Sequence, residues 1–596
     1  MKPRRVRVPL AARLALALAA MAGVAAADSP PRSRTEKPVD YRRAVASLEE
    51  MIAGEIKRGA FSAVSIALVD DQQTVYANGF GLADKDRGVP ATAQTVYRAG
   101  SISKLLTALA AMQLVEQGKL DIDKPAAAFD PSFRIVNPFD GSGPVTLRQL
   151  MCHRSGMIRE SPVGSYFDPS QPEIAATVAS IAPCVLVYPP GSRTKYSNVG
   201  PTIVGQVVQK VSGVPFAEYQ RKHLLEPLGM RSSAFLPNDS MRRRLAVGWM
   251  DVADGRGGFR RTAAPQFELG TIPAGNLYTT AEDLARFASC LLANGRAGDR
   301  QIVRPETLRQ MCTVQLTSEK TGYGLGFLVG TFRKHRSVSH MGAVYGFTSS
   351  LVVLPEAKLG AVVLSNEDIA IGPVRKLSDA AIGLMLEAKL GEPMPKEEPP
   401  KGPPPDPATL VGDYESESYW ARIELQQGVL GGALSGRRMS LTPTGPDKFL
   451  AEVGWSVSET LDFQRDEKGR ATAFTVLSQK FRRVDPAAVP DVPADWQKYV
   501  GSYGPDFIPV IVSVRHGHLY AMTENEADYR LTPLCRTVFK LPPGMYVDEQ
   551  VVFQVAPDGR VPSILFANMP LGRRELRGNS KSEARVVRDD VGIKTG

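Results

Sequence analysis

The chain has 596 residues, a formal net charge of +10, and 43% hydrophobic residues. One hydrophobic core rarely serves so long a chain, so two to four domains are expected. Five of the positive charges precede residue 28, which leaves +5 for the rest, and no basic patch is interleaved with aromatic residues. The charge therefore gives no support for nucleic acid as a partner.

The cysteines are odd in number and widely spaced, at positions 152, 184, 290, 312 and 535. This pattern argues against a disulfide framework and against a Cys-x-x-Cys metal site. We expect neither a metal nor an organic cofactor.

Residues 1–27 have the pattern of a secretory signal peptide. Basic residues precede an alanine- and leucine-rich run, and Ala25-Ala26-Ala27 offers a cleavage site of the A-x-A type. A retained anchor is the alternative, but the apolar run is shorter than the roughly 20 residues that a membrane span needs. We therefore expect an exported protein, periplasmic or secreted, with a flexible leader over 28–40 and no stable membrane span after cleavage.

Residues 41–390 are predicted to form one α+β domain. An amphipathic helix over 41–57 is followed by a hairpin of strands at 62–69 and 74–81, and strands return only late in the domain. Helical patterns lie between them, and one more helix follows the last strand. The later predicted helices cover 147–157, 199–211, 215–228, 284–292 and 374–390, and the later strands cover 324–329, 338–340, 346–354 and 360–365.

A proline-rich linker over 391–407 leads to an internal repeat. Gly412, Tyr414 and Phe463 match Gly501, Tyr503 and Phe553 at offsets of 89 or 90 residues. Short β-rich segments separated by turn residues predict two small antiparallel β-barrels of about eight strands each. We place the first barrel at 408–486, the second at 487–578, and a flexible tail at 579–596.

The stretch Gly100-Ser101-Ile102-Ser103-Lys104 precedes an apolar run that predicts a buried helix. Residues three apart on a helix share one face, so the Lys104 amine can reach the Ser101 hydroxyl and activate it as a nucleophile. The pattern is weak alone, because Ser192-Arg193-Thr194-Lys195 repeats it in a predicted turn. A capping serine with a solvated lysine is the alternative interpretation.

Two further motifs follow in a fixed order: Tyr196-Ser197-Asn198 and His340-Met341-Gly342. Together with Ser101-x-x-Lys104 and the stretch from Leu150 to Gly156, residues 41–390 resemble the class C β-lactamase and penicillin-binding family of serine hydrolases. The layout of one catalytic domain followed by two β-barrels is similar to that of the D-aminopeptidases in this family.

The resemblance implies a role for each motif residue. Ser101 forms an acyl-enzyme, and Lys104 and Tyr196 share the proton transfers, with the base of each step left open. Asn198 contacts the substrate amide or holds Lys104. The backbone N–H groups of Ser101 and Ala343 form the oxyanion site. His340, Gly342 and Ala343 then line the substrate site.

The third motif departs from the family pattern, because most β-lactamases and cell-wall peptidases carry Lys-Thr-Gly where this chain has His340-Met341-Gly342. The missing cation weakens a site for a substrate carboxylate, and a histidine there resembles the esterase and D-aminopeptidase branches. We expect a hydrolase of small amides, D-amino-acid peptides or esters, with a small-molecule or peptide substrate that could derive from the cell wall. The alternatives are a β-lactamase, a DD-peptidase, or a penicillin- or peptidoglycan-binding receptor that acylates without turnover. The sequence does not predict an oligomeric state.

Overall fold

The computed structural model describes residues 38–253, 258–395, 406–453, 459–524 and 527–574. The predicted signal peptide, nearly all of the leader, most of the linker and the predicted tail lie outside the described residues. Of the helices in the described ranges, none combines the length and the apolar character that crossing a bilayer requires.

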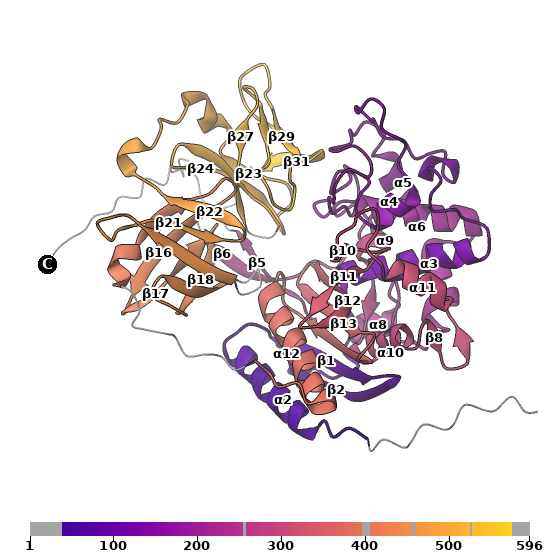
Figure 1. Cartoon of the computed structure of the whole chain (residues 1–596). Coiled ribbons are helices and arrows are strands. Elements are labelled where there is room, and N and C mark those ends of the chain that lie inside the picture. The colour runs from indigo at the N-terminus through magenta and orange to yellow at the C-terminus, as the bar shows by residue number, and fades with distance from the viewer. Residues whose placement is uncertain (1–37, 254–257, 396–405, 454–458, 525–526, 575–596) are drawn as a thin grey trace, which may run out of the picture. The chain divides into compact units, whose positions relative to one another are not determined.

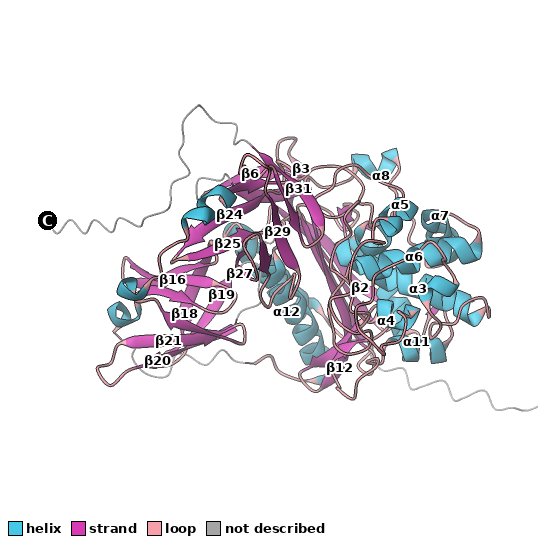
Figure 2. Cartoon of the chain, turned by 90° about the horizontal axis from the view of Figure 1, so that it is seen from above, coloured by secondary structure: helices cyan, strands magenta, loops and turns pink. Residues whose placement is uncertain are grey.

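The α+β domain is built on an eight-stranded antiparallel sheet (Figures 1 and 2). Its strand order is β10-β11-β12-β13-β14-β1-β2-β3, so strands from the start of the domain pair with strands from its end. Val64 of β1, for example, lies opposite Ser365 of β14. The strands are β1 (Ala63–Asp70), β2 (Gln73–Asp84), β3 (Val89–Pro90), β10 (Gly322–Tyr323), β11 (Leu328–Phe332), β12 (His335–Val344), β13 (Phe347–Leu354) and β14 (Leu359–Ser365).

Helices cover both faces of this sheet, which is why every residue of β13 and β14 is buried. Helices α2 (Arg42–Lys57) and α12 (Ile371–Leu390) pack together on one face, and α10 (Ala281–Leu292) packs on the other (Figure 1). The Thr280 side chain caps α10 by accepting a hydrogen bond from the Asp283 N–H at 3.2 Å.

A helical region is inserted between the two sets of strands. Its central helix, α3 (Ser103–Glu116), packs against α6 (Val199–Ser212) and α9 (Ile272–Gly275). Because neighbours surround α3, it is apolar on all sides rather than on one stripe. The remaining helices are α4 (Leu147–Met151), α5 (Ile174–Ala179), α7 (Phe216–Gln220), α8 (Asp239–Arg243) and α11 (Pro305–Met311), and the two-stranded ribbons pair β4 (Tyr97–Arg98) with β7 (Tyr278–Thr279), β5 (Trp249–Ala253) with β6 (Phe259–Ala263) and β8 (Arg296–Ala297) with β9 (Arg300–Gln301).

Three elements differ from the sequence-based expectation. The helix predicted over 215–228 is divided into α7 and a π-helical turn, Arg221–Leu225. The helix predicted over 147–157 ends at Met151, because His153 adopts a left-handed backbone with φ of 57° and turns the chain toward the active site. The strand predicted over 324–329 begins only at Leu328. Residues 324–327 instead turn the chain between β10 and β11, with Gly326 at φ of 85°.

The first repeat is a closed antiparallel barrel of eight strands, in agreement with the prediction. Its interior is filled by aromatic side chains, among them Tyr414, Phe463 and Phe474, whose ring centroids lie 5.0–6.1 Å apart. The strands are β15 (Gly412–Glu415), β16 (Trp420–Gln426), β17 (Val429–Leu434), β18 (Arg437–Pro443), β19 (Lys448–Val453), β20 (Glu459–Arg465), β21 (Ala471–Val476) and β22 (Gln479–Arg483).

The second repeat is a nine-stranded antiparallel sheet that is nearly closed, rather than a closed barrel of eight. The strand that corresponds to β18 is split at Leu531 into two short strands, which lie at opposite ends of the sheet order. The strands are β23 (Gly501–Tyr503), β24 (Val510–Arg515), β25 (His518–Met522), β26 (Asp528–Arg530), β27 (Thr532–Pro533), β28 (Val538–Lys540), β29 (Gln550–Gln554), β30 (Ser563–Phe566) and β31 (Met569–Arg574).

Candidate active site

Ser101 lies in a short 3₁₀ turn, Gly100–Ile102, that leads directly into α3. The preceding Gly100 has φ of 51°, and a Cβ atom there would lie 2.8 Å from the backbone N of Ala343. Only glycine fits a turn that crosses β12 so closely. The local sequence therefore places Ser101 directly against the strand that carries the third motif.

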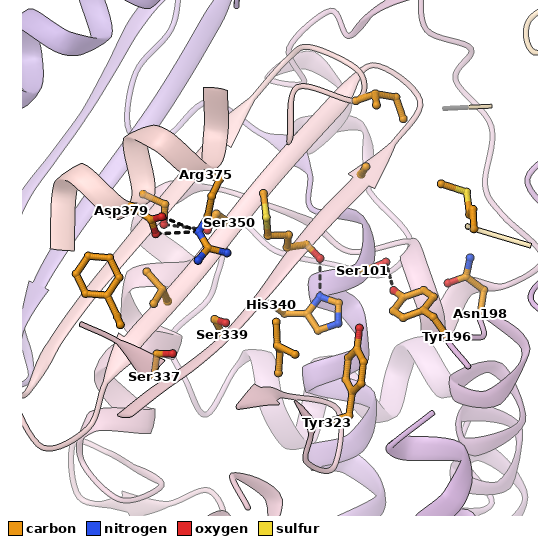
Figure 3. Close-up of a pocket in the computed structure, with 18 of the residues that line it drawn as sticks. Ser101, Tyr196, Asn198, Tyr323, Ser337, Ser339, His340, Ser350, Arg375 and Asp379 are labelled. Atoms are coloured by element: carbon orange, nitrogen blue, oxygen red, sulfur yellow. Dashed lines mark hydrogen bonds and ion pairs between the residues drawn. The ribbon is translucent and has the colours of Figure 1, made fainter. Parts of the chain in front are cut away.

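The Ser101 hydroxyl contacts both predicted proton-transfer groups. Lys104 Nζ lies 2.9 Å from Ser101 Oγ. The Tyr196 hydroxyl lies 2.8 Å from the same oxygen (Figure 3). Lys104 Nζ also donates to the carbonyl oxygen of Ala274 at 2.7 Å. The structure thus brings together three residues from α3, its leading turn and the loop before α6.

Burial shifts the pKa values of Lys104 and Tyr196 in opposite directions and so favours the uncharged form of each group. Lys104 is 1% exposed, and burial lowers the pKa of its amine well below the ordinary 10.5. Burial also raises the pKa of the Tyr196 hydroxyl above its usual value. The neutral amine is therefore available as a base, while the phenol keeps its proton.

His153 holds Tyr196 in place. Its ring stacks on that of Tyr196 with centroids 4.3 Å apart, and its Nδ1 accepts a hydrogen bond from the Ser197 N–H at 3.2 Å. Burial lowers the pKa of His153 well below its usual value, so the ring is neutral. The histidine that the motif Leu150 to Gly156 contains thus supports the site without touching Ser101.

Asn198 is the first residue before α6 and lines the same cavity as Ser101. Its side-chain amide donates to a carboxylate oxygen of Glu160, and its backbone N–H donates to the carbonyl oxygen of Arg159 at 2.8 Å. Within the described contacts, the amide therefore pairs with Glu160 and not with Lys104.

The C-terminal part of β12 packs against the turn that carries Ser101. A Cβ atom on Gly342 would lie 2.0 Å from the Ala99 carbonyl oxygen and 2.9 Å from the Ser101 nitrogen, so the strand and the nucleophile turn are in backbone contact. The backbone nitrogens of Ser101 and Ala343 therefore both lie at the place where the Gly100–Ile102 turn crosses β12. An oxyanion site needs two such donors around the reacting carbonyl.

His340 is buried and uncharged. Its Nδ1 donates to the carbonyl oxygen of Met341, and burial lowers its pKa to about 4. Its ring centroid lies 6.4 Å from that of Tyr196 and 6.5 Å from that of Tyr323. Neutral imidazole thus occupies the place where the family pattern puts a lysine.

A cavity of about 410 Å³ opens beside these groups, a size that suits a small-molecule substrate. It extends along β12 past Ser339 and Ser337 to the ion pair between Arg375 and Asp379, 2.8 Å long (Figure 3). Within the described ranges, no group of three or more His, Cys, Asp or Glu side chains is arranged to hold a metal ion.

The sequence reasoning missed many of the lining residues, among them Arg159, Tyr323, Glu524 and Met545. Arg159 follows the recognised motif closely, but nothing in its sequence context marks it. Glu524 and Met545 belong to loops of the second repeat, and only folding brings them to the catalytic domain.

Comparison with known proteins agrees with this geometry. The Beta-lactamase family model matches residues 48–383, which is more than half of the chain. Penicillin-binding protein 4 of Amycolatopsis lactamdurans is 28% identical over 348 residues, which cover 56% of this chain and 89% of that protein. Protein flp of Staphylococcus aureus (strain MW2) is 24% identical over 54% of this chain and 62% of its own length.

One solved structure extends the likeness beyond the matched domain. The octameric penicillin-binding protein homologue from Pyrococcus abyssi superposes with a TM-score of 0.53 at 25% identity, and the match covers 73% of this chain and 99% of that one. With its SxxK nucleophile turn, α+β fold and two C-terminal barrel-like sheets, this chain belongs to the Beta-lactamase family of serine hydrolases.

Proposed function

We propose that the chain is an exported serine hydrolase that forms an acyl-enzyme at Ser101 and acts on a small amide, a D-amino-acid peptide or an ester. The observation that carries the proposal is the pair of contacts at Ser101 Oγ, 2.9 Å from a buried lysine amine and 2.8 Å from a tyrosine hydroxyl. A serine hydroxyl needs a base at this distance to become a nucleophile.

In the acylation step, the neutral Lys104 amine takes the proton of Ser101 while Oγ attacks the substrate carbonyl carbon. The N–H groups of Ser101 and Ala343 stabilise the resulting oxyanion. Tyr196, which burial keeps protonated, donates its proton to the leaving group and recovers a proton from the Lys104 ammonium. Water then attacks the acyl carbon, with the same pair returning the proton to Ser101.

His340 favours the amide and ester branches over β-lactams. Its imidazole carries no charge near neutral pH, so this position of β12 offers no ion pair to the carboxylate that β-lactams carry. An uncharged or amine-bearing acyl group avoids that deficit.

A fluorophosphonate probe, which reacts with activated serines, tests the nucleophile. We expect the wild-type chain to be labelled and Ser101→Ala to remain unlabelled, while Ser192→Ala, in the second Ser-x-x-Lys pattern, is labelled like the wild type. Labelling of Ser101→Ala would remove Ser101 from this role.

Turnover on p-nitrophenyl esters, D- and L-aminoacyl anilides and a chromogenic β-lactam tests the substrate class. Steady product release after the first equivalent supports an enzyme. A burst without further turnover supports a receptor instead, and activity on the β-lactam alone would reverse the ranking of the branches.

Export is tested separately. Mass spectrometry of the chain purified from the periplasm or medium of an expressing bacterium is expected to find Asp28 as the first residue. An intact chain that starts at Met1 and stays in the cytoplasm would contradict the proposal.

A further inference from the structure

The strand that carries the third motif places no charge beside Tyr196, because His340 is buried and neutral. The titratable and charged groups that face Tyr196 come from several elements and are Lys104, His153, Arg159, Glu160, Tyr323 and His340. Arg159 is the one cation among them that stays protonated across the working pH range.

The Arg159 guanidinium lies between two tyrosine rings. Its Cζ atom is 5.2 Å from the ring centroid of Tyr196 and 5.5 Å from that of Tyr546, which belongs to the second repeat. Its Nε has no hydrogen-bond partner among the described atoms and lies 3.7 Å from a Glu160 carboxylate oxygen. Stacking on aromatic rings, rather than a short bidentate ion pair, therefore fixes the guanidinium.

The charge of Arg159 acts on both proton-transfer groups. Burial is the main cause of the low pKa of Lys104, and Arg159 lowers that pKa further, whereas Glu160 raises it. Arg159 also opposes the rise that burial imposes on the pKa of Tyr196. Positive charge at this place thus favours the neutral amine that the proposed mechanism requires.

The second repeat also binds the main chain of Arg159 and the residue before Tyr196. The Glu549 carboxylate accepts hydrogen bonds from the Arg159 N–H at 3.0 Å and from Lys195 Nζ at 2.8 Å. The side chains of Lys195 and Glu549 are each 1% exposed. Because Lys195 directly precedes Tyr196, one buried carboxylate ties both the tyrosine segment and the arginine segment to the second repeat.

We propose that Arg159 is a positioning residue whose charge beside Tyr196 favours the neutral Lys104 amine, and that the loop 541–549 of the second repeat holds it against Tyr196. The inference rests on the proposed function, since it assigns how the same Lys104 and Tyr196 are tuned. It makes the second repeat a working part of the catalytic site.

The acid limb of the pH profile of kcat/KM, measured on a p-nitrophenyl ester, tests the role of the charge. Arg159→Gln is expected to move this limb to higher pH by roughly one unit, about a tenfold loss of rate on the limb, because Lys104 then holds its proton more tightly. Arg159→Lys, which keeps the charge, is expected to stay near the wild-type limb. Equal shifts for both variants, or no shift for Arg159→Gln, would overturn the proposal.

Arg193→Gln serves as the matched control. Arg193 stacks on Tyr188 at 4.5 Å next to the same repeat but does not line the cavity. Its limb is expected to coincide with that of the wild type, and a shift equal to that of Arg159→Gln would assign the effect to general charge instead of to position.

Tyr546 tests the part played by the second repeat and does not depend on whether Arg159→Gln folds. Tyr546→Leu removes the stacked ring and is expected to move the limb in the same direction as Arg159→Gln. Tyr546→Phe keeps the ring and loses only the hydrogen bond from the Tyr546 hydroxyl to Glu524, 2.6 Å long, so its limb is expected to stay in place. Identical profiles for the two variants would overturn this part.

The labelling experiment distinguishes failure of the proposed function from failure of the role proposed for Arg159. Labelling of Ser101→Ala would overturn the proposed function and this inference with it. Loss of that labelling, together with acid limbs that do not move in any Arg159 variant, would overturn this inference alone.

Discussion

The two repeats have related strand orders, apart from the strand that is split at Leu531 in the second, and they differ in the loops that join the strands. In the first repeat, β17 and β18 are joined by the two-residue turn Ser435-Gly436, whereas residues 523–527 join β25 and β26 in the second. Residues 541–549 join β28 and β29 of the second repeat. Both of these second-repeat loops reach the α+β domain, since they carry Glu524, Met545 and Glu549.

None of the described residues of the first repeat lines the catalytic cavity. Its contacts go elsewhere: Trp420 donates to Asp528 of the second repeat at 2.9 Å, and Arg437 lies 3.7 Å from Asp251 of β5. Among the described residues, the first repeat therefore contacts the second repeat and β5, whereas the second repeat lines the cavity beside Ser101. Loops of the second repeat, and not its strands, supply the described side chains that line the cavity.

Equivalent glutamates give the strongest test of this difference. Glu549 and Glu459 occupy the same position at an offset of 90, but Glu549 pairs with buried Lys195, whereas Glu459 accepts one hydrogen bond from the Leu477 N–H at 2.8 Å. Glu549→Ala leaves an uncompensated buried charge and is expected to lower the free energy of unfolding by about 3–5 kcal/mol. Glu459→Ala is expected to cost about 1 kcal/mol.

Chemical denaturation of both variants measures these costs. Similar losses for the two glutamates would mean that the repeats are equally important to the catalytic domain and would contradict the comparison.

Asp528, at the contact between the repeats, predicts a pH dependence of stability. Burial raises its pKa to about 6, although the Trp420 hydrogen bond opposes the shift. The folded chain therefore holds this proton more tightly than the unfolded chain, and the contribution of Asp528 to stability falls as pH rises from about 4 to about 6. The fall is at most about 3 kcal/mol.

Melting curves between pH 4 and pH 7 check this prediction against Asp528→Asn, whose amide does not titrate. The stability of the wild type minus that of the variant is expected to decrease with rising pH across this window and to stay flat above it. A difference that increases with pH would show that Asp528 is charged in the folded chain.

Much of the site was predictable because its chemistry is local or ordered along the chain. Ser101 and Lys104 are three residues apart on one helical turn, and the order of Tyr196 and His340 behind them marked the family. The sheet followed from continuous apolar strands such as β1, and the repeat followed from its fixed offset.

The remainder depends on contacts between distant segments. Arg159 resembles any surface arginine in the sequence, and its neighbour Glu549 lies 390 residues away. The end of helix α4 at Met151 was also missed, because His153 leaves the helix to stack on Tyr196, a tertiary contact that overrides the local helical pattern. The sequence shows how many residues separate the predicted strands, but it does not show that the loops with Glu524 and Met545 point toward Ser101.

Met545 tests whether the second repeat also contributes to selectivity. Its side chain lines the cavity, and truncation removes an adaptable apolar contact from the wall. Met545→Ala is expected to change the ranking of p-nitrophenyl esters of different acyl length by several-fold in kcat/KM, with the acid limb unmoved. A uniform loss over the whole series would indicate a general packing defect instead.

Arg437→Ala is expected to have the smallest effect of these substitutions, and it tests the first repeat. The 3.7 Å contact between Arg437 and Asp251 is partly exposed and long for an ion pair, so the loss of this ion pair is expected to contribute less than about 1 kcal/mol to the change in unfolding free energy. Because no described residue of the first repeat lines the cavity, kcat/KM and the acid limb are expected to match the wild type. A change of more than about twofold in kcat/KM, at unchanged stability, would mean that the first repeat also reaches the active site, through the β5 and β6 ribbon.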